Sequence, residues 1–142
     1  NSGPAGWGPW ITNSYVSLSQ IPYAQYDVYD YFSADQSGRN GIVPDGTTSF
    51  SFSTLGAASV SGANALLVQT TDIANGNPGA NYAVFSGLTG GSQTFTVNPT
   101  SGNDQWLGIA GFQVVAVPEP SALALGALGL MIVGAGRRSR QS

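Results

Sequence analysis

Alternating apolar and polar side chains dominate residues 14–117. In residues 49–53, serines alternate with Phe50 and Phe52, so one face of an extended segment is aromatic and the other carries hydroxyls. Residues 23–32 alternate similarly, and their more apolar face holds Ala24, Tyr26, Val28 and Phe32. Further strands are predicted at residues 14–18, 57–61, 65–71, 81–86, 92–98 and 106–117. Because sustained helical periodicity is absent here, we expect an all-β fold, an antiparallel β-sandwich of the jelly-roll kind.

Turn chemistry separates the predicted strands. Residues 33–46 form a turn-rich excursion that ends in Asp45-Gly46, a dipeptide typical of tight hairpins. Residues 75–79, Asn-Gly-Asn-Pro-Gly, mark another loop. The spacing of strands and turns predicts a single β-domain over residues 1–117.

The pattern changes abruptly at Val117. The next three residues, Pro118-Glu119-Pro120, cannot continue a sheet, because proline lacks an N–H and fixes φ. Residues 121–136 then carry no charged side chain. The chain ends in a basic cluster of Arg137, Arg138 and Arg140.

The uncharged segment, residues 121–136, is a candidate transmembrane α-helix. As a helix it would be roughly 24 Å long, which is shorter than the hydrocarbon core of about 30 Å. A buried C-terminal core helix is the alternative interpretation. The arginine cluster favours the membrane, since arginine side chains reach the headgroups and shorten the mismatch. By the positive-inside rule the C-terminus would be cytoplasmic and the β-domain outside.

Together, the Pro-Glu-Pro motif, the Ala/Leu/Gly-rich span and the arginine-rich end resemble the PEP-CTERM sorting domain of bacterial surface proteins, over residues 117–141. The resemblance implies that exosortase, a membrane-embedded cysteine protease-transpeptidase, recognises Pro118–Pro120 and cleaves nearby. The mature domain would be released, or transferred to the envelope of a bacterium that makes exopolysaccharide. Glu119, the only glutamate in the chain, would be read by the enzyme. We therefore predict that residues 118–142 are the sorting signal. The alternative is that Pro118–Pro120 is only a rigid linker.

The preceding domain shows a second, looser similarity. Residues 26–29, 37–41, 81–89 and 108–114 are similar to segments of β-sandwich modules of the discoidin or galactose-binding kind. That resemblance implies a jelly roll, but a shared fold does not carry a shared function. In such modules further strands precede the position of Asn1, so we expect the domain to be truncated at its N-terminus.

Composition points to an exported protein and argues against some partners. Only 8% of the 142 residues are charged and 20 are glycine, which is typical of extracellular β-rich modules with polar turns. The net charge is −3: residues 1–117 hold six aspartates against Arg39, and the tail holds Glu119 against the other three arginines. Lysine is absent, so no basic patch on the domain can neutralise phosphates, and nucleic-acid binding is not expected.

The absence of cysteine and histidine removes most familiar catalytic chemistry. Neither a disulfide framework, a Ser-His-Asp or Cys-His arrangement, nor a thiolate or histidine zinc site can form. Asp27 and Asp30 lie three residues apart on a predicted strand, so they face opposite sides of the sheet and form no local carboxylate pair for glycoside hydrolysis.

Calcium is the one cofactor that the loops suggest. Oxygen-rich segments surround Asp35, Asp72 and Asp104, with Asn75, Asn77 and Asn103 as neighbouring amides. None of them has EF-hand spacing, and solvated turn residues are the alternative interpretation.

Exposed aromatic side chains are candidates for stacking on sugar rings. The candidates are Trp7, Trp10, Trp106 and Tyr82. Core packing or strand-end anchoring is the alternative for each of them.

These observations favour a non-enzymatic exported protein of the cell surface or extracellular matrix, anchored and sorted through its C-terminal signal. The expected partners are exosortase and the membrane. The alternative function is a carbohydrate-binding module for extracellular polysaccharide, and an enzyme is the third and least favoured class.

Overall fold

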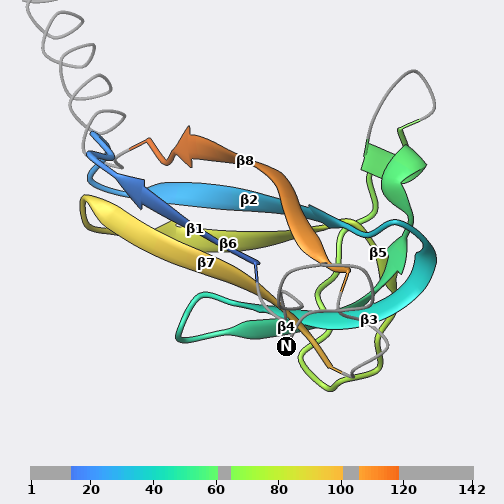
Figure 1. Ribbon diagram of the computed structural model, residues 1–142. Coiled ribbons are helices and arrows are strands. Elements are labelled where there is room, and N and C mark those ends of the chain that lie inside the picture. The colour runs from blue at the N-terminus through green and yellow to red at the C-terminus, as the bar shows by residue number, and fades with distance from the viewer. Residues whose placement is uncertain (1–13, 61–64, 101–105, 119–142) are drawn as a thin grey trace, which may run out of the picture.

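The computed structural model describes residues 14–60, 65–100 and 106–118, and it consists mainly of β-strands in two sheets (Figure 1). The elements are β1 (Ser14–Ser19), β2 (Tyr26–Ser33), β3 (Ser37–Pro44), β4 (Ser49–Leu55), the 3-10 helix η1 (Ala57–Val60), β5 (Gly79–Ala80), β6 (Tyr82–Leu88), β7 (Ser92–Pro99) and β8 (Gly108–Ala116). One sheet has the order β1-β7-β3-β4-β5 and the other has the order β6-β2-β8. The predicted all-β class is confirmed.

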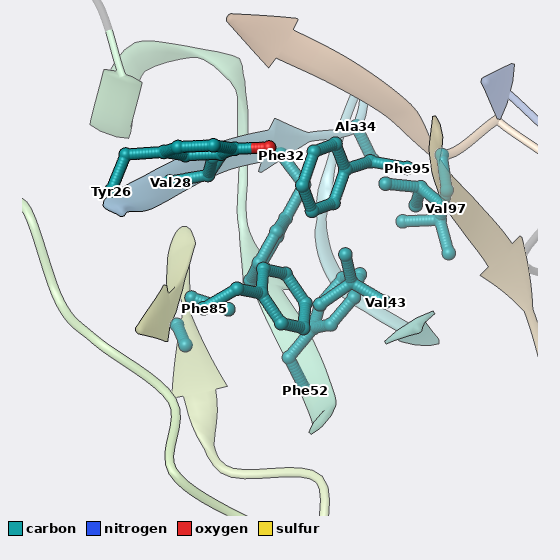
Figure 2. Packing of buried hydrophobic residues seen from close by; sticks show 12 residues of the cluster. Tyr26, Val28, Phe32, Ala34, Val43, Phe52, Phe85, Phe95 and Val97 are labelled. Carbon is teal, nitrogen blue, oxygen red and sulfur yellow. The ribbon is translucent and has the colours of Figure 1, made fainter. Parts of the chain in front are cut away.

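Nearly all strand pairs are antiparallel, as predicted. The exception among the named strands is β5, which runs parallel to β4 through two residue pairs. The sheets face each other across a core to which both contribute. Phe32 of β2 stacks on Phe52 of β4, and Phe85 of β6 contacts Phe95 of β7 with ring centroids 5.3 Å apart (Figure 2).

β2 is the central strand of the three-stranded sheet, and its residues alternate strictly between buried and half-buried. Tyr26, Val28 and Phe32 are fully buried, whereas Tyr29 and Tyr31 are only half-buried on the outer face. Each buried aromatic or branched side chain stabilises the fold by about 1.5–3 kcal/mol relative to an exposed one. Ala24 was predicted for the same face, but it precedes the strand and is exposed.

The two faces of β4 are both covered. Phe52 is buried in the core, and Ser51, predicted on the opposite, hydroxyl-bearing face, is also buried. The loop before β5 covers it, because the Ser51 N–H donates to the Asp72 carbonyl at 2.8 Å. Thr70 Oγ1 donates to the Ser51 carbonyl at 2.6 Å. Polar groups buried in this way are tolerated because they are hydrogen-bonded.

The predicted hairpin at Asp45-Gly46 is confirmed as the β3–β4 connection. The Asp45 carboxylate accepts the backbone N–H groups of Thr47 at 2.8 Å and Thr48 at 2.6 Å. Gly46 has φ 93°, which a residue without Cβ adopts at little cost.

Two predicted strands are wrong. Residues 57–61 begin with the 3-10 helix η1, because Gly56 turns the chain at φ 84° and its carbonyl accepts the Ser59 N–H at 3.1 Å. Within residues 65–71 the described pairing is one isolated bridge from Gln69 to Tyr82. Here the buried side chain of Asn81 replaces a ladder, since its Oδ1 accepts the Val68 N–H at 2.8 Å.

One strand lies where only turns were predicted. β3 occupies residues 37–44, the middle of the predicted turn-rich excursion at residues 33–46. Its first half is polar and only partly buried, and the strand is held by pairing with β4 and, near Gly41, with β7. Sequence periodicity is weak in such a strand, because only Gly41 and Val43 are buried.

Candidate functional site

The chain leaves the folded domain at the end of β8. Ala116, the last residue of β8, pairs with Tyr26 at the start of β2. The next residue, Val117, donates its backbone N–H to the Gln25 carbonyl at 3.0 Å. Pro118 follows, is exposed, and has no N–H with which to continue the ladder. The predicted sorting motif therefore begins two residues after the end of β8, with only Val117 in between.

Most of the tail prediction concerns residues that the structure does not describe. Glu119, Pro120, the predicted helix 121–136 and the cluster of Arg137, Arg138 and Arg140 lie outside the described residues. Trp7, Trp10 and Asp104 do so as well. Across the described ranges, which end at Pro118, none of the helices has the length and apolar character needed to cross a membrane.

A hollow of about 280 Å³ is lined in part by Trp106, one of the two sugar-stacking candidates that the structure describes, the other being Tyr82. Its walls come from the end of β2, from helix η1 and from the start of β8. The lining residues are Ser33, Ala34, Asp35, Ala57 and residues 106–110. The lining is mainly apolar, and 43% of the Trp106 surface is exposed. An aromatic side chain that lines a mainly apolar hollow is a candidate contact for a ligand.

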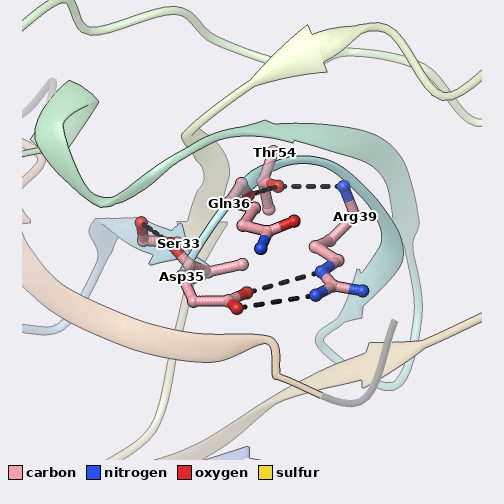
Figure 3. Close-up of polar contacts among 6 residues, drawn as sticks. Ser33, Asp35, Gln36, Arg39 and Thr54 are labelled. Carbon is pink, nitrogen blue, oxygen red and sulfur yellow. Dashed lines mark hydrogen bonds and ion pairs between the residues drawn. The ribbon is translucent and has the colours of Figure 1, made fainter. Parts of the chain in front are cut away.

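An ion pair stands beside this hollow. Arg39 donates from Nε to Asp35 Oδ1 at 3.4 Å and from Nη2 to Asp35 Oδ2 at 3.5 Å (Figure 3). The Asp35 side chain is 48% exposed, so solvent screens the pair and its contribution to stability is small. The backbone N–H of Arg39 donates to Thr54 Oγ1 at 3.1 Å, and that hydroxyl donates to the Gln36 carbonyl at 2.8 Å. These bonds fix the β2–β3 turn to β4.

The two calcium candidates that the structure describes, Asp35 and Asp72, use carboxylate oxygens in contacts within the fold. Asp35 pairs with Arg39, and Asp72 accepts the Ser51 hydroxyl at 2.6 Å and the N–H groups of Ala74 at 2.8 Å and Asn77 at 3.0 Å. The Ser51 hydroxyl, followed by these backbone donors, holds the pKa of Asp72 below its ordinary value. In the described part of the chain no three acidic side chains gather closely enough to hold a metal ion. A calcium site stays a prediction.

Tyr82 lies among other tyrosines. Its ring centroid is 6.2 Å from that of Tyr29 and 5.6 Å from that of Tyr31. Since the alternate residues of β2 are buried, these rings lie on the outer face of the three-stranded sheet. Tyr82 is therefore a member of an aromatic row that the sequence analysis did not identify.

Asp30 is a further residue of interest, and the sequence analysis did not predict its burial. It lies on the same buried face of β2 as Val28 and Phe32, is 1% exposed, and neither carboxylate oxygen has a hydrogen-bond partner. Burial raises its pKa from 3.8 to about 7. Strand parity could have identified it. Asp27 faces the other way and accepts the Gly87 N–H at 2.8 Å, so the two carboxylates are not a pair, as predicted.

Comparison with known proteins identifies the C-terminal segment. Residues 116–141 match the PEP-CTERM protein-sorting motif. No curated protein and no solved structure matches the chain. The matched region begins at Ala116, the last residue of β8. The chain therefore carries a PEP-CTERM sorting motif, joined directly to the end of a folded all-β domain.

Proposed function

We propose that this chain is a non-enzymatic protein of the cell surface or extracellular matrix, exported and then sorted through its C-terminus by exosortase. The observation that supports it most is the PEP-CTERM motif at residues 116–141. Such a motif implies an exported protein that is sorted at the membrane and processed by exosortase. The folded domain ahead of it would be the cargo.

The tail would act as a temporary membrane anchor. Residues 121–136 are uncharged and would form the membrane span, and the arginines that follow would hold the C-terminus in the cytoplasm. Pro118, Glu119 and Pro120 would then lie on the outer side, where the processing enzyme reads them. The mature β-domain would end at the cell surface or outside the cell.

The residues of the domain support a non-enzymatic role. The chain has no histidine or cysteine to serve as base or nucleophile. Asp27, Asp45 and Asp72 accept hydrogen bonds from neighbouring backbone, and Asp35 pairs with Arg39. We propose that the domain is a jelly roll of the galactose-binding kind that acts as a binding or structural module.

Carbohydrate binding is the second candidate function, and the hollow at Trp106 favours it. An indole can stack on the C–H groups of a sugar, and the carboxylate of Asp35, which also lines the hollow, can accept hydrogen bonds from sugar hydroxyls. The ligand would be an extracellular polysaccharide. In this arrangement Trp106 would stack on the sugar ring, and the hydrogen bonds to Asp35 would fix the orientation of the sugar.

The sorting function is tested by expressing the chain, behind an export signal, in an exosortase-bearing host and in the same host without exosortase. The chain should appear as a membrane-bound precursor in both, and as a shorter mature form only where exosortase is present. A mature form of the same size in the host without exosortase would contradict the proposal.

A further inference from the structure

The sorting motif follows the folded domain without a spacer. Ala116 is still paired with Tyr26, and Val117 is still hydrogen-bonded to Gln25 at 3.0 Å. An extended chain advances at most about 3.6 Å per residue, so Pro120 lies within roughly 11 Å of Val117. An enzyme that holds residues 118–120 in its active site must therefore meet this end of the domain.

Two turns form the end from which the chain leaves. One is residues 20–25 between β1 and β2, and the other is residues 89–91 between β6 and β7; Figure 1 shows both beside the end of β8. We call these two turns the exit face. The Ile21 N–H donates to the Gly91 carbonyl at 3.1 Å and joins them.

The exit face is also tied to the core. The side chain of Tyr26 is fully buried, and its hydroxyl donates to the Gly90 carbonyl at 2.9 Å. With Val117 bonded to Gln25, the exit strand and both turns are held in one arrangement. Peeling β8 away to lengthen the tail would break backbone pairs beside this buried tyrosine. The domain is therefore expected to remain folded while the motif is read.

The surface chemistry of the exit face suits close contact with another protein. Residues 17–26 and 86–93 contain no charged side chain, and Tyr23 is 41% exposed. A Cβ added at Gly90 or Gly91 would meet no atom within 4 Å, so no neighbouring side chain covers the backbone at these two positions. Protein interfaces are depleted of charge at their centres and enriched in tyrosine. An anionic lipid surface, in contrast, recruits lysine and arginine, which this face lacks.

We propose that the exit face docks on the membrane-embedded processing enzyme while Pro118–Pro120 occupy its active site. The inference rests on the proposed sorting function and adds a second recognition surface to it. Contact through the folded domain adds binding energy beside the short motif and holds the motif in register with the active site. Substrate recognition then depends on residues far from the motif in sequence.

Gly91→Trp tests the docking surface, with Gly111→Trp as the matched control. Both glycines have ordinary φ values and open space at the Cβ position, so neither substitution strains the fold. Gly111 lies in β8, opposite Tyr31 and away from the exit face. In an exosortase-bearing host, Gly91→Trp should slow conversion of precursor to mature protein by roughly tenfold or more. Gly111→Trp should leave that rate unchanged. Thermal melting should show that the domain is folded in both variants.

A flexible spacer separates steric contact from other effects. About eight Gly/Ser residues inserted between Val117 and Pro118 would let the motif reach the active site of the enzyme without bringing the exit face against the enzyme. With the spacer present, chains with and without Gly91→Trp should be processed at the same rate. Docking is overturned if Gly91→Trp is processed like wild type, if Gly111→Trp slows processing equally, or if the spacer fails to remove the difference. Loss of exosortase-dependent processing in the wild-type chain would instead contradict the sorting function itself.

Discussion

The ring of Phe32 in β2 stacks on the ring of Phe52 in β4, with centroids 3.7 Å apart and planes inclined by 24°. The contact joins the two sheets, and both side chains are fully buried. Truncating either ring would remove apolar contacts from both sheets at once and leave a cavity that a sheet cannot easily close.

Phe52→Ala should therefore lower the free energy of unfolding by about 3–5 kcal/mol. Phe112→Ala is the control, because Phe112 is 39% exposed on the edge strand β8 and should cost much less. Chemical denaturation followed by circular dichroism measures both changes. Equal effects from the two substitutions would contradict the assignment of the core.

The buried carboxyl of Asp30 should make stability fall as pH rises. Its pKa is raised from 3.8 to about 7, so between these values the folded state keeps a proton that the unfolded state has lost. The free energy of unfolding should decline through this window by up to about 1.4 kcal/mol per pH unit and then level off. Asp30→Asn, which does not titrate, should remove this slope. Urea unfolding at a series of pH values measures it, and an unchanged slope in the variant would refute the assignment to Asp30.

Asp72 should act in the opposite direction at lower pH. Its pKa is lowered, first by the Ser51 hydroxyl, so the folded state favours the ionised form. This contribution is present above the ordinary pKa of 3.8 and is lost as pH falls through the lowered pKa. Ser51→Ala should therefore make the domain unfold at a higher pH during acid titration, and Ser49→Ala, on an exposed neighbour, should not. Identical acid transitions for the two variants would contradict the role of this hydrogen bond.

If the hollow at Trp106 binds polysaccharide, Trp106→Ala should weaken that binding by about tenfold, equivalent to about 1.4 kcal/mol. Tyr15→Ala is the control, because Tyr15 is 71% exposed on the edge strand β1 and lines no part of the hollow. Affinity electrophoresis in gels containing the host's exopolysaccharide compares the two variants with wild type. Retardation that is lost equally in both, or in neither, would exclude the hollow as the site.

Sequence alone predicted features that depend on local pattern. Alternation identified β2 and β4, and Asp45-Gly46 identified the hairpin. The sequence-based prediction failed where tertiary contacts replace periodicity. The side chain of Asn81 holds a loop within residues 65–71, which were predicted to be a strand, and β3 forms because it pairs with neighbouring strands. The hollow at Trp106 was also beyond prediction, because residues distant in sequence form it. The sorting motif was predictable because it is read along the chain, without folding.

The positive charges of the tail should determine retention in the membrane. Replacing Arg137, Arg138 and Arg140 with glutamine should weaken stop-transfer and let uncleaved precursor reach the periplasm, because the segment before them is short and rich in glycine. Fractionation followed by immunoblotting locates the precursor. Retention equal to wild type would contradict the proposed anchoring role of the arginine cluster.

Glu119→Gln tests the central claim most directly. The substitution leaves the proposed membrane span and the arginine cluster intact, but it removes the one charge in Pro118–Pro120 that the processing enzyme would read. Immunoblots of fractionated cells of an exosortase-bearing host compare the precursor and mature sizes of the variant with those of wild type. We predict that full-length Glu119→Gln accumulates in the inner membrane while wild type is converted to the mature form. Processing of Glu119→Gln at the wild-type rate would contradict the sorting function and leave residues 118–120 as a plain linker.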